Sequence, residues 1–324
     1  MRGSYEAELG GGSTMASTGF RQHTLKNSIY CSGTGLHSGA RVALSLHPAK
    51  PDTGIVFRRA DIGGPDAEIS ARYDQVSDTR LCTKVTNDAG ISVSTVEHLM
   101  AALAGCQLDN VIVEINGPEL PIMDGSAEPF VFLIDCAGVV AQDMPRRAIR
   151  ILKPVAVTDG NSSARVEPWT GSTINIELDF ETAVIGQRSM FFDMLSDSFR
   201  GELSRARTFG FLHEVEALQA AGLARGGSME NAVVISGDTV LNEGGLRFDD
   251  ECARHKALDC VGDLYMAGAP IIGHFHGIRP GHAINNRLLR RLFADPSAWE
   301  SVDMDEAADA FGNKLDSREA AASA

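Results

Sequence analysis

The sequence predicts an α+β fold made of two similar modules, each a mostly antiparallel sheet with helices on one face. Three observations support this prediction. Both halves of the chain contain several strand-like stretches. Each half then carries an apolar helix, and a polar segment with a proline, 139–148, separates the halves. Runs of strands followed by helices are typical of sheets whose helices gather on one side.

The first half shows an alternation of apolar and polar residues that is typical of strands. Its strand-like stretches are 40–49, 53–60, 91–98 and 110–117. At 94–105 (STVEHLMAALAG) the period changes to that of a helix, with Ser94 and Glu97 at capping-box spacing and Gly105 as the stop signal. A second helix is expected at 128–138.

The second half repeats this style. Its expected strands are 150–160, 163–169, 173–180, 232–238, 246–248 and 269–281. Its expected helices are 213–224, 251–268 and 282–293, of which 251–268 is the clearest. The stretch 198–212 combines a polar helix-like part with an apolar strand.

We expect four segments along the chain: a leader at 1–20, a first module at 21–143, a second module at 144–303 and an acidic tail at 304–324. The leader is rich in glycine and serine and lacks the apolar stretch of a signal peptide. It reads as an added segment, so the native chain is expected to begin near Met15.

Composition argues against several classes of function. The formal net charge of −14 argues against a nucleic-acid partner. No apolar run approaches the ~20 residues that span a bilayer, so stable membrane insertion is not expected. Six cysteines form no C-x-x-C pair, which favours a reducing, cytoplasmic location over a disulfide framework.

Two ionisable clusters lie in the apolar helices. His255 and Asp259 are four residues apart, so a helix places both side chains on one face. His98 lies in the apolar helix of the first half. Two imidazoles and one carboxylate can hold a metal ion with one position open, as catalytic zinc requires. The sequence therefore predicts one Zn²⁺ per chain, and the same ligands also tolerate Fe²⁺.

Residues around these ligands have the chemistry of a hydrolase. Glu97, next to His98, could take a proton from water that the metal has acidified. His282, in the turn PGHA, could protonate a leaving group because the ordinary pKa of histidine is near neutrality. Lys256 or Thr208 could stabilise the developing oxyanion.

Plainer interpretations compete with these roles. Glu97 could only close the capping box with Ser94, and the His/Asp pair at i,i+4 could be a surface ion pair. Asp263, two turns beyond His255, could replace His98 as the third ligand or could fix the tautomer of a histidine. The sequence leaves these alternatives open.

Other residues near the motifs carry weaker signals. Phe209 and Phe211 share a face of an extended segment, either as core packing or as an apolar wall for a lipid-like substrate. Arg279, beside the PGHA turn, is the best candidate for a phosphate contact. His274 and His276 alternate along a strand, where we expect a polar strand end rather than a metal site.

Eight motifs follow one another along the chain: TGLHSG, LCT, STVEHLMAALAG, PIMDGSA, SRARTFGF, LNEGGLRFDDE, RHKALDCVGDL and GHAINN. In sequence and spacing they resemble the UDP-3-O-acyl-N-acetylglucosamine deacetylases of lipid A (lipopolysaccharide) synthesis. The resemblance extends from about Arg21 to about residue 303 and is specific, because several long motifs match in order.

The resemblance implies a zinc amidase that removes acetate from the 2-acetamido group of a UDP-sugar carrying a 3-hydroxyacyl chain. It implies that His98, His255 and Asp259 bind zinc and that Glu97 is the base. The other implied roles are His282 as the acid, Asp263 as the residue that orients it, Lys256 and Thr208 at the polarised carbonyl, Phe209 and Phe211 against the substrate, Cys82 close to the metal, and Asp179 and Phe180 at the uridine.

The fold that the resemblance implies is two α+β modules packed face to face with zinc between them. An insert in the second module is expected to form an apolar passage for the acyl chain, and the protein is expected to be a monomer. Two other hypotheses stand beside this one. The first is a metal amidase or esterase for another acylated substrate, and the second is a non-catalytic module of the same fold that binds a partner.

Overall fold

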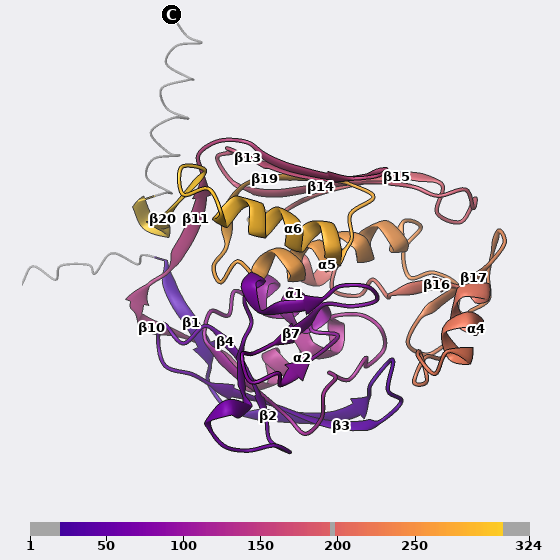
Figure 1. Cartoon of the computed structure of the whole chain (residues 1–324), viewed down its shortest axis with the longest axis horizontal. Helices are drawn as coiled ribbons and strands as arrows, with labels where there is room; N and C mark the ends of the chain where they lie inside the picture. The colour runs from indigo at the N-terminus through magenta and orange to yellow at the C-terminus, as the bar shows by residue number, and fades with distance from the viewer. Residues whose placement is uncertain (1–19, 195–197, 307–324) are drawn as a thin grey trace, which may run out of the picture.

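The structure is a computed structural model that describes residues 20–194 and 198–306. Nearly all of the expected leader and most of the expected tail lie outside the described residues. The remaining chain stacks in four layers, with a sheet on each outer side and two layers of helices between them (Figure 1). This arrangement confirms the α+β class predicted from the sequence.

The first half of the chain forms one outer sheet, with strand order β2-β3-β9-β4-β5. Neighbouring strands are antiparallel except β4 and β9. The strands are β2 (Ile29–Thr34), β3 (Arg41–Pro48), β4 (Ile55–Arg59), β5 (Glu68–Ser70) and β9 (Val111–Ile115). Strand alternation buries Val42, Leu44 and Leu46 of β3, as the pattern at 40–49 predicts.

Two helices cover the inner face of this sheet. They are α1 (Glu97–Gly105) and α2 (Glu128–Ala137). α2 ends where Gly138 adopts a φ of 73°, a conformation that favours glycine. A 3₁₀ turn, Pro65–Ala67, lies between β4 and β5. Between β5 and α1 the chain forms a second 3₁₀ turn and a small antiparallel sheet: Tyr73–Gln75, β6 (Val76–Asp78), β7 (Lys84–Thr86) and β8 (Ser92–Val93).

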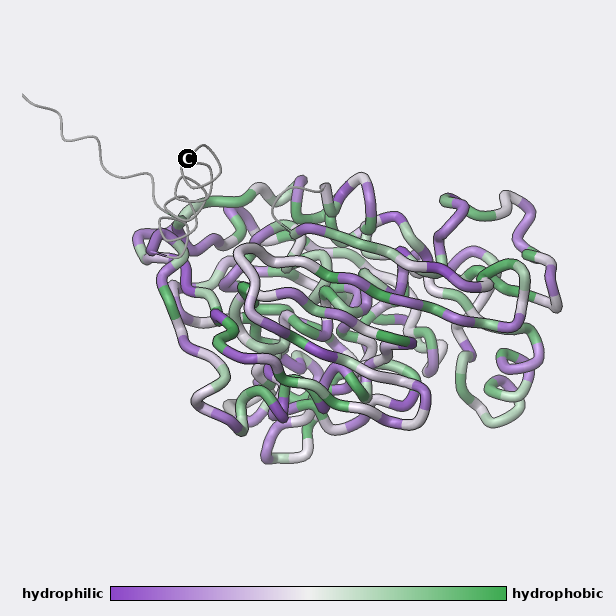
Figure 2. Tube along the Cα trace, turned by 90° about the horizontal axis from the view of Figure 1, so that it is seen from above, coloured by the Kyte–Doolittle hydropathy of each residue, from purple (hydrophilic) through white to green (hydrophobic). Residues whose placement is uncertain are grey.

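The second half forms the other outer sheet. Its main strand order is β12-β13-β19-β11-β20, and β14 adds a branch by pairing with both β19 and β15. The strands are β11 (Arg147–Ile151), β12 (Val155–Asp159), β13 (Ser162–Glu167), β14 (Ser172–Asp179), β15 (Gln187–Asp193), β19 (Ile271–Ile278) and β20 (Trp299–Asp303). Hydrophilic and hydrophobic residues alternate along β14, and both kinds are interspersed over this side of the molecule (Figure 2), as expected for a sheet with one buried face.

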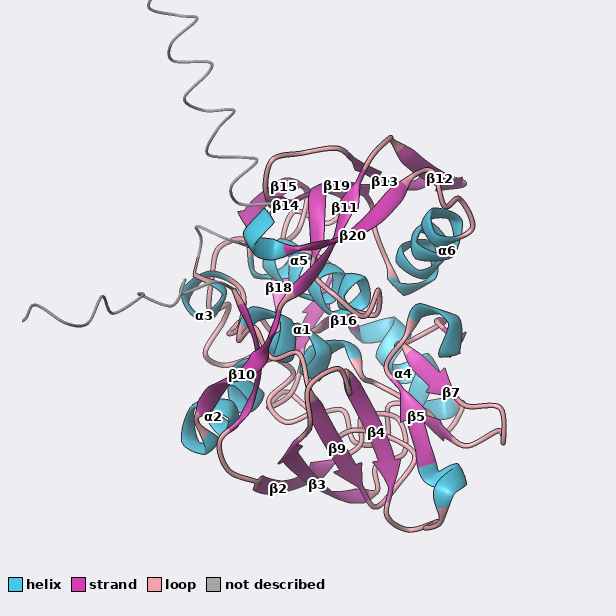
Figure 3. Cartoon of the chain, turned by 90° about the vertical axis from the view of Figure 1, so that its left-hand side faces the viewer, coloured by secondary structure: helices cyan, strands magenta, loops and turns pink. Residues whose placement is uncertain are grey.

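Helices α5 (Glu251–Tyr265) and α6 (His282–Phe293) lie beneath this sheet, facing the helices of the first half (Figures 1 and 3). A smaller unit projects at one end of the molecule. It contains β16 (Phe209–Phe211), α4 (Leu212–Ala220), β17 (Val233–Ser236) and β18 (Thr239–Val240), and it follows the short helix α3 (Phe199–Glu202). None of the helices in the described ranges is both long and apolar enough to cross a membrane.

The strand expected at 246–248 is absent from the described structure, and that prediction is wrong. The backbone N–H of Arg247 donates to the side chain of Glu251 at 2.6 Å, so a carboxylate takes the place of a strand partner. Conversely, the sequence analysis did not predict β20, which pairs with β11 inside the region expected to lead into the acidic tail.

The chain changes sheet partners at Arg146. β10 (Val139–Pro145) pairs with β1 (Arg21–Leu25), whereas β11 pairs with β19 and β20 of the second half. The buried Arg146 guanidinium donates to Asp109 Oδ1 at 2.8 Å. This exchange lies inside the segment 139–148 that the sequence marks as a boundary; the four segment limits themselves stay a prediction.

Candidate metal centre

Two helices from opposite halves of the chain meet at the centre of the molecule. α1 and α5 cross closely because α5 has Gly262 at the contact. A Cβ atom at Gly262 would lie 2.1 Å from the carbonyl oxygen of Glu97 and 3.1 Å from the amide nitrogen of Ala101. Only glycine fits this approach, which brings the candidate ligands of the two helices together.

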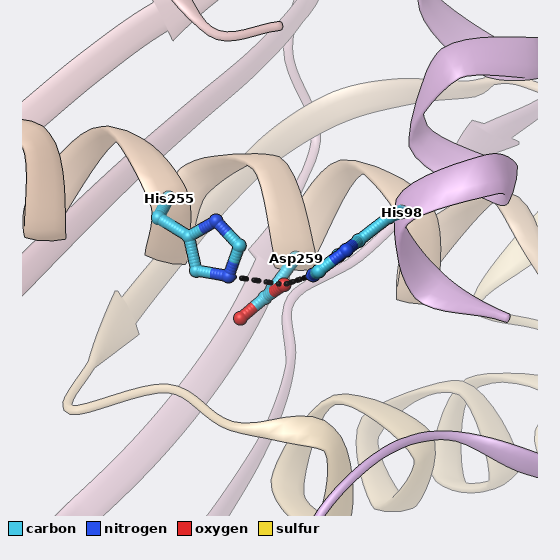
Figure 4. Close-up of side chains that lie close together, drawn as sticks. All are labelled: His98, His255 and Asp259. Carbon is cyan, nitrogen blue, oxygen red and sulfur yellow. Dashed lines mark ion pairs between the residues drawn. The ribbon is translucent and has the colours of Figure 1, made fainter. Parts of the chain in front are cut away.

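His98 of α1 faces His255 and Asp259 of α5 (Figure 4). One ligand atom of each residue lies within 4.8 Å of the others, and all three side chains are buried. The Nε2 atoms of His98 and His255 lie 3.7 Å and 3.4 Å from Asp259 Oδ1. That oxygen is buried and has no hydrogen-bond partner among the described residues. A buried carboxylate oxygen without a partner is costly, so the donor set fits a metal ion.

The electrostatics of the group favour the ligating forms. Burial lowers the pKa of His98 to about 3, with a further contribution from His255, and burial also lowers the pKa of His255. Burial alone would raise the pKa of Asp259, but His255 and Lys256 hold it below its ordinary value. Two neutral imidazoles and a carboxylate are the forms that bind a metal.

A backbone carbonyl orients His255. Its Nδ1 lies 3.0 Å from the carbonyl oxygen of Ala206. Because a carbonyl can only accept, Nδ1 carries the proton and Nε2 is left to ligate. The adjacent Arg207 donates from Nε to buried Glu251 at 2.8 Å, and its backbone N–H donates to the same carboxylate at 3.0 Å. This buried pair fixes the segment that carries the carbonyl.

Glu97 is the first residue of α1 and lies beside the three ligands. Its Oε2 accepts from the backbone N–H of Thr83 at 2.9 Å. Burial raises the pKa of Glu97 to about 7, against the opposing effect of His282. The capping-box interpretation is wrong: the hydroxyl of Ser94 donates to the carbonyl of Pro118, and the helix has no side-chain cap.

His282 begins α6 and lies between two carboxylates. Its Nδ1 is 2.8 Å from Asp263 Oδ2, and its Nε2 is 3.8 Å from Glu97 Oε1. Burial alone would lower the pKa of His282, but Asp263 and Glu97 raise it to about 10. Of the two alternatives left open for Asp263, the structure places it against a histidine, and His98 completes the group of possible ligands.

Lys256 lies next to the ligands, and Thr208 belongs to the neighbouring segment. Lys256 Nζ donates to Asp259 Oδ2 at 3.0 Å and lies 5.7 Å from the centre of the Phe209 ring. Thr208 is fixed by backbone hydrogen bonds of 2.8 Å to Gly125 and Val233. No hydrogen bond within the described residues joins its hydroxyl to the three ligands.

Aromatic side chains form a wall beside His255. The ring centre of Phe180 lies 6.2 Å from that of Phe209 and 6.0 Å from that of Phe211. The ring centre of Phe209 lies 6.5 Å from that of His255. The two phenylalanines predicted to contact substrate are therefore joined by Phe180, which was predicted to contact uridine.

The other residues predicted to contact substrate are Asp179, Arg279 and Cys82. Asp179 accepts from Arg279 at 2.7 Å, so the predicted phosphate-binding arginine already has an acidic partner. Burial, with a contribution from Glu97, raises the pKa of Cys82 to about 12. That thiol is therefore protonated at neutral pH and is a poor ligand.

His274 and His276 have polar partners outside the metal group, which consists of His98, His255 and Asp259. His274 Nδ1 is 2.8 Å from the hydroxyl of Thr173, and His276 Nε2 is 2.8 Å from Glu177 Oε1. Both side chains are half-buried on β19, and they take no part in the metal-ligand group found among the described residues. The structure agrees with the polar-strand interpretation.

Several residues that shape the site were missed by the sequence analysis. Thr83 contacts both Glu97 and Asp263, and Asn285 donates to Asp263 at 2.9 Å. Both residues lie in sequence motifs described above, LCT and GHAINN, but a single hydroxyl or amide has no spacing signal that reveals its partner.

A cavity of about 340 Å³ lies between the two halves, away from the metal group. Its lining is mainly apolar and includes Gly105, Phe199, Val261 and Phe275. Neither Phe209 nor Phe211 lines it, so this cavity does not represent the predicted acyl passage.

The chain is similar to known proteins over most of its length. Residues 22–294 match the model of the UDP-3-O-acyl N-acetylglycosamine deacetylase family. A UDP-3-O-acyl-N-acetylglucosamine deacetylase of Phenylobacterium zucineum is 52% identical over 86% of this chain and 95% of the relative. Enzymes of that name from Acidithiobacillus ferrooxidans and Vibrio parahaemolyticus are 51% and 49% identical over 88% of this chain and 94% of each relative. The chain therefore belongs to the UDP-3-O-acyl N-acetylglycosamine deacetylase family.

Proposed function

We propose that this chain is a zinc-dependent hydrolase that removes acetate from the 2-acetamido group of UDP-3-O-(3-hydroxyacyl)-N-acetylglucosamine, an early step of lipid A biosynthesis. Its family and the names of its relatives support the reaction and the substrate. The observation that carries the proposal is the buried group of His98, His255 and Asp259, flanked by a carboxylate and a histidine.

The three ligands would hold zinc, which supplies Lewis-acid chemistry by acidifying water to a pKa of about 7 and polarising a carbonyl. Glu97 accepts the proton of the attacking water, a role that a buried carboxyl with a pKa of about 7 can fill near neutrality. His282, which is protonated at neutral pH, donates a proton from Nε2 to the amine nitrogen as the C–N bond breaks. The products are acetate and a free amine.

The surrounding residues would bind and orient the substrate. Asp263 keeps the proton on His282 Nδ1 and orients the ring. Lys256 and Thr208 stabilise the oxyanion, and Cys82 lies nearby as a non-catalytic neighbour. Phe209 and Phe211 line the path of the acyl chain, while Asp179, Phe180 and Arg279 contact the uridine diphosphate. The aromatic wall beside His255 supports the acyl contact.

The identity of the metal, the oligomeric state and the cellular location are part of the same proposal. Zinc is proposed because two histidines and a carboxylate suit it, although Fe²⁺ binds the same set. All three ligands come from one chain, which supports a monomer as the working unit. The six cysteines are free thiols, which supports a reducing, cytoplasmic setting.

Glu97→Gln tests the catalytic assignment. The amide keeps an acceptor for Thr83 but cannot take a proton, so we expect turnover to fall roughly 10²–10⁴-fold while zinc stays near one per chain. Rates are measured as acetate release, and zinc by elemental analysis. Glu177→Gln, which changes a carboxylate on the outer face of the sheet, is the control and should leave both unchanged. Near-normal turnover in Glu97→Gln would remove Glu97 from the mechanism.

The substrate is tested by comparing acylated and unacylated UDP-N-acetylglucosamine. We expect the 3-O-acyl group to increase kcat/KM strongly, because the aromatic wall lies beside the metal group. Equal kcat/KM for the two sugars would favour a general metal amidase. No release of acetate by the zinc-loaded protein would favour a binding module.

A further inference from the structure

Thr83 is placed at the junction of the two halves of the candidate site. It is 2% exposed and lies in the loop between β6 and β7, before α1 in the chain. Its backbone is fixed to the start of α1 by two hydrogen bonds. The N–H donates to Glu97 Oε2 at 2.9 Å, and the carbonyl accepts from the N–H of Val96 at 3.3 Å.

The side chain of Thr83 reaches the other half of the molecule. Its hydroxyl donates to Asp263 Oδ1 at 2.6 Å, across 180 residues of sequence. The other oxygen, Oδ2, faces His282 Nδ1 at 2.8 Å and accepts from Asn285 at 2.9 Å. Among the described residues, Thr83 is the donor that the structure gives to Oδ1. A carboxylate held on both oxygens has one orientation, which in turn fixes the imidazole that it faces.

We propose that Thr83 is a positioning residue that joins Glu97 and the Asp263–His282 pair into one hydrogen-bonded unit. The inference rests on the proposed function, because it assigns Thr83 to the geometry of that reaction. The proton acceptor and the proton donor come from different halves of the chain. Thr83 fixes the distance between these two groups. Its backbone N–H donates to Glu97, and its hydroxyl donates to Asp263, the partner of His282.

This role differs from packing. Valine has nearly the same shape as threonine and would fill the same space, but it offers no donor to Asp263 Oδ1. Losing that donor leaves a buried carboxylate oxygen unsatisfied and frees Asp263 to turn. The three metal ligands are not partners of Thr83, so the unit can loosen without loss of the metal.

The test compares Thr83→Val with Thr83→Ser in the full-length, zinc-loaded protein. Hydrogen bonds to charged groups are strong, so we expect kcat of Thr83→Val to fall roughly ten- to a hundredfold. KM and zinc content should stay close to those of the parent, and Thr83→Ser should restore most of kcat. Thr173→Val, which removes the hydroxyl of another buried threonine and its contact with His274, is the matched control and should keep its kcat.

A double-mutant cycle distinguishes a positioning role of Thr83 from a general weakening of the protein structure. If Thr83 acts through Asp263, then Thr83→Val should lower kcat much less in an Asp263→Ala background than in the parent. Additive losses, or a Thr83→Val variant as fast as the parent, would overturn the inference while leaving the deacetylase intact. Failure of the parent protein to release acetate would instead overturn the proposed function.

Discussion

The imidazole of His282 lies between two buried carboxylates, and this determines the pH at which it can donate a proton. Asp263 contacts its Nδ1, and Glu97 lies on the side of its Nε2. Burial opposes a charged imidazole, yet the two carboxylates raise the pKa of His282 to about 10. A histidine of this kind stays protonated through the physiological range and loses its proton only in alkaline solution.

Asp263→Asn is expected to move the alkaline limit of activity. The amide keeps a similar shape but removes the negative charge that most raises the pKa of His282, so this pKa falls. Because His282 must be protonated to act as an acid, activity disappears as pH rises through its pKa. The alkaline limb of the kcat/KM profile should therefore shift to lower pH.

The control for this profile is Asp295→Asn, which removes a carboxylate that pairs with Lys153 instead. Its alkaline limb should remain where it is in the parent protein. A limb that stays unchanged in Asp263→Asn would show that another group supplies the proton.

At the residue scale, the sequence predicts the members of the site better than their partners. Helical spacing alone places His255 and Asp259 on one face, and two apolar helices suggest that His98 joins them. Which residue Asp263 serves is not a local property, because His282 lies 19 positions away on another helix. The contact between Thr83 and Asp263 spans 180 positions and involves one hydroxyl, which no periodicity can reveal.

At the element scale, the crossing of α1 and α5 decides whether the ligands meet. Gly262 lets the backbone of α5 approach Glu97 and Ala101 directly. Hydrophobic periodicity predicts both helices, because apolar residues recur at helical spacing in each. It does not predict the point at which the two helices cross, because that point depends on the position of a single glycine, Gly262. The sequence does not predict β20, and it predicts a strand at 246–248 that the structure lacks. Tertiary hydrogen bonds decide the structure of both segments.

Gly262→Ala should separate these helices. The added methyl group would meet backbone atoms of Glu97 and Ala101, and backbone cannot move aside as a flexible side chain could. We expect the free energy of unfolding to fall by about 1–3 kcal/mol and zinc affinity to fall about tenfold or more. Denaturant unfolding and competition with a chelator measure the two effects.

Gly244→Ala is the matched control, because nothing lies within 4 Å of a Cβ atom at that position. It should change neither quantity by a comparable amount. Unchanged zinc affinity in Gly262→Ala would mean that the helix crossing does not set the ligand geometry.

At the scale of the whole molecule, the metal group connects the two halves of the chain. His98 belongs to the half that carries the β2-β3-β9-β4-β5 sheet, whereas His255 and Asp259 belong to the half built on β19. The covalent connection between the halves changes sheet partners at Arg146. A metal ion at this place therefore acts as a second connection, one that exists only in the folded state.

Zinc should accordingly raise the unfolding temperature of the whole chain. At a free zinc concentration a hundred times its Kd, the expected stabilisation is about 2.7 kcal/mol, which for a chain of this length corresponds to a Tm increase of roughly 4–5 °C. Calorimetry of chelated and zinc-reconstituted protein measures the shift. His98→Ala should abolish it, because one half then contributes no ligand, whereas His276→Ala on the outer face should retain it. The same shift in both variants would place the stabilising zinc elsewhere.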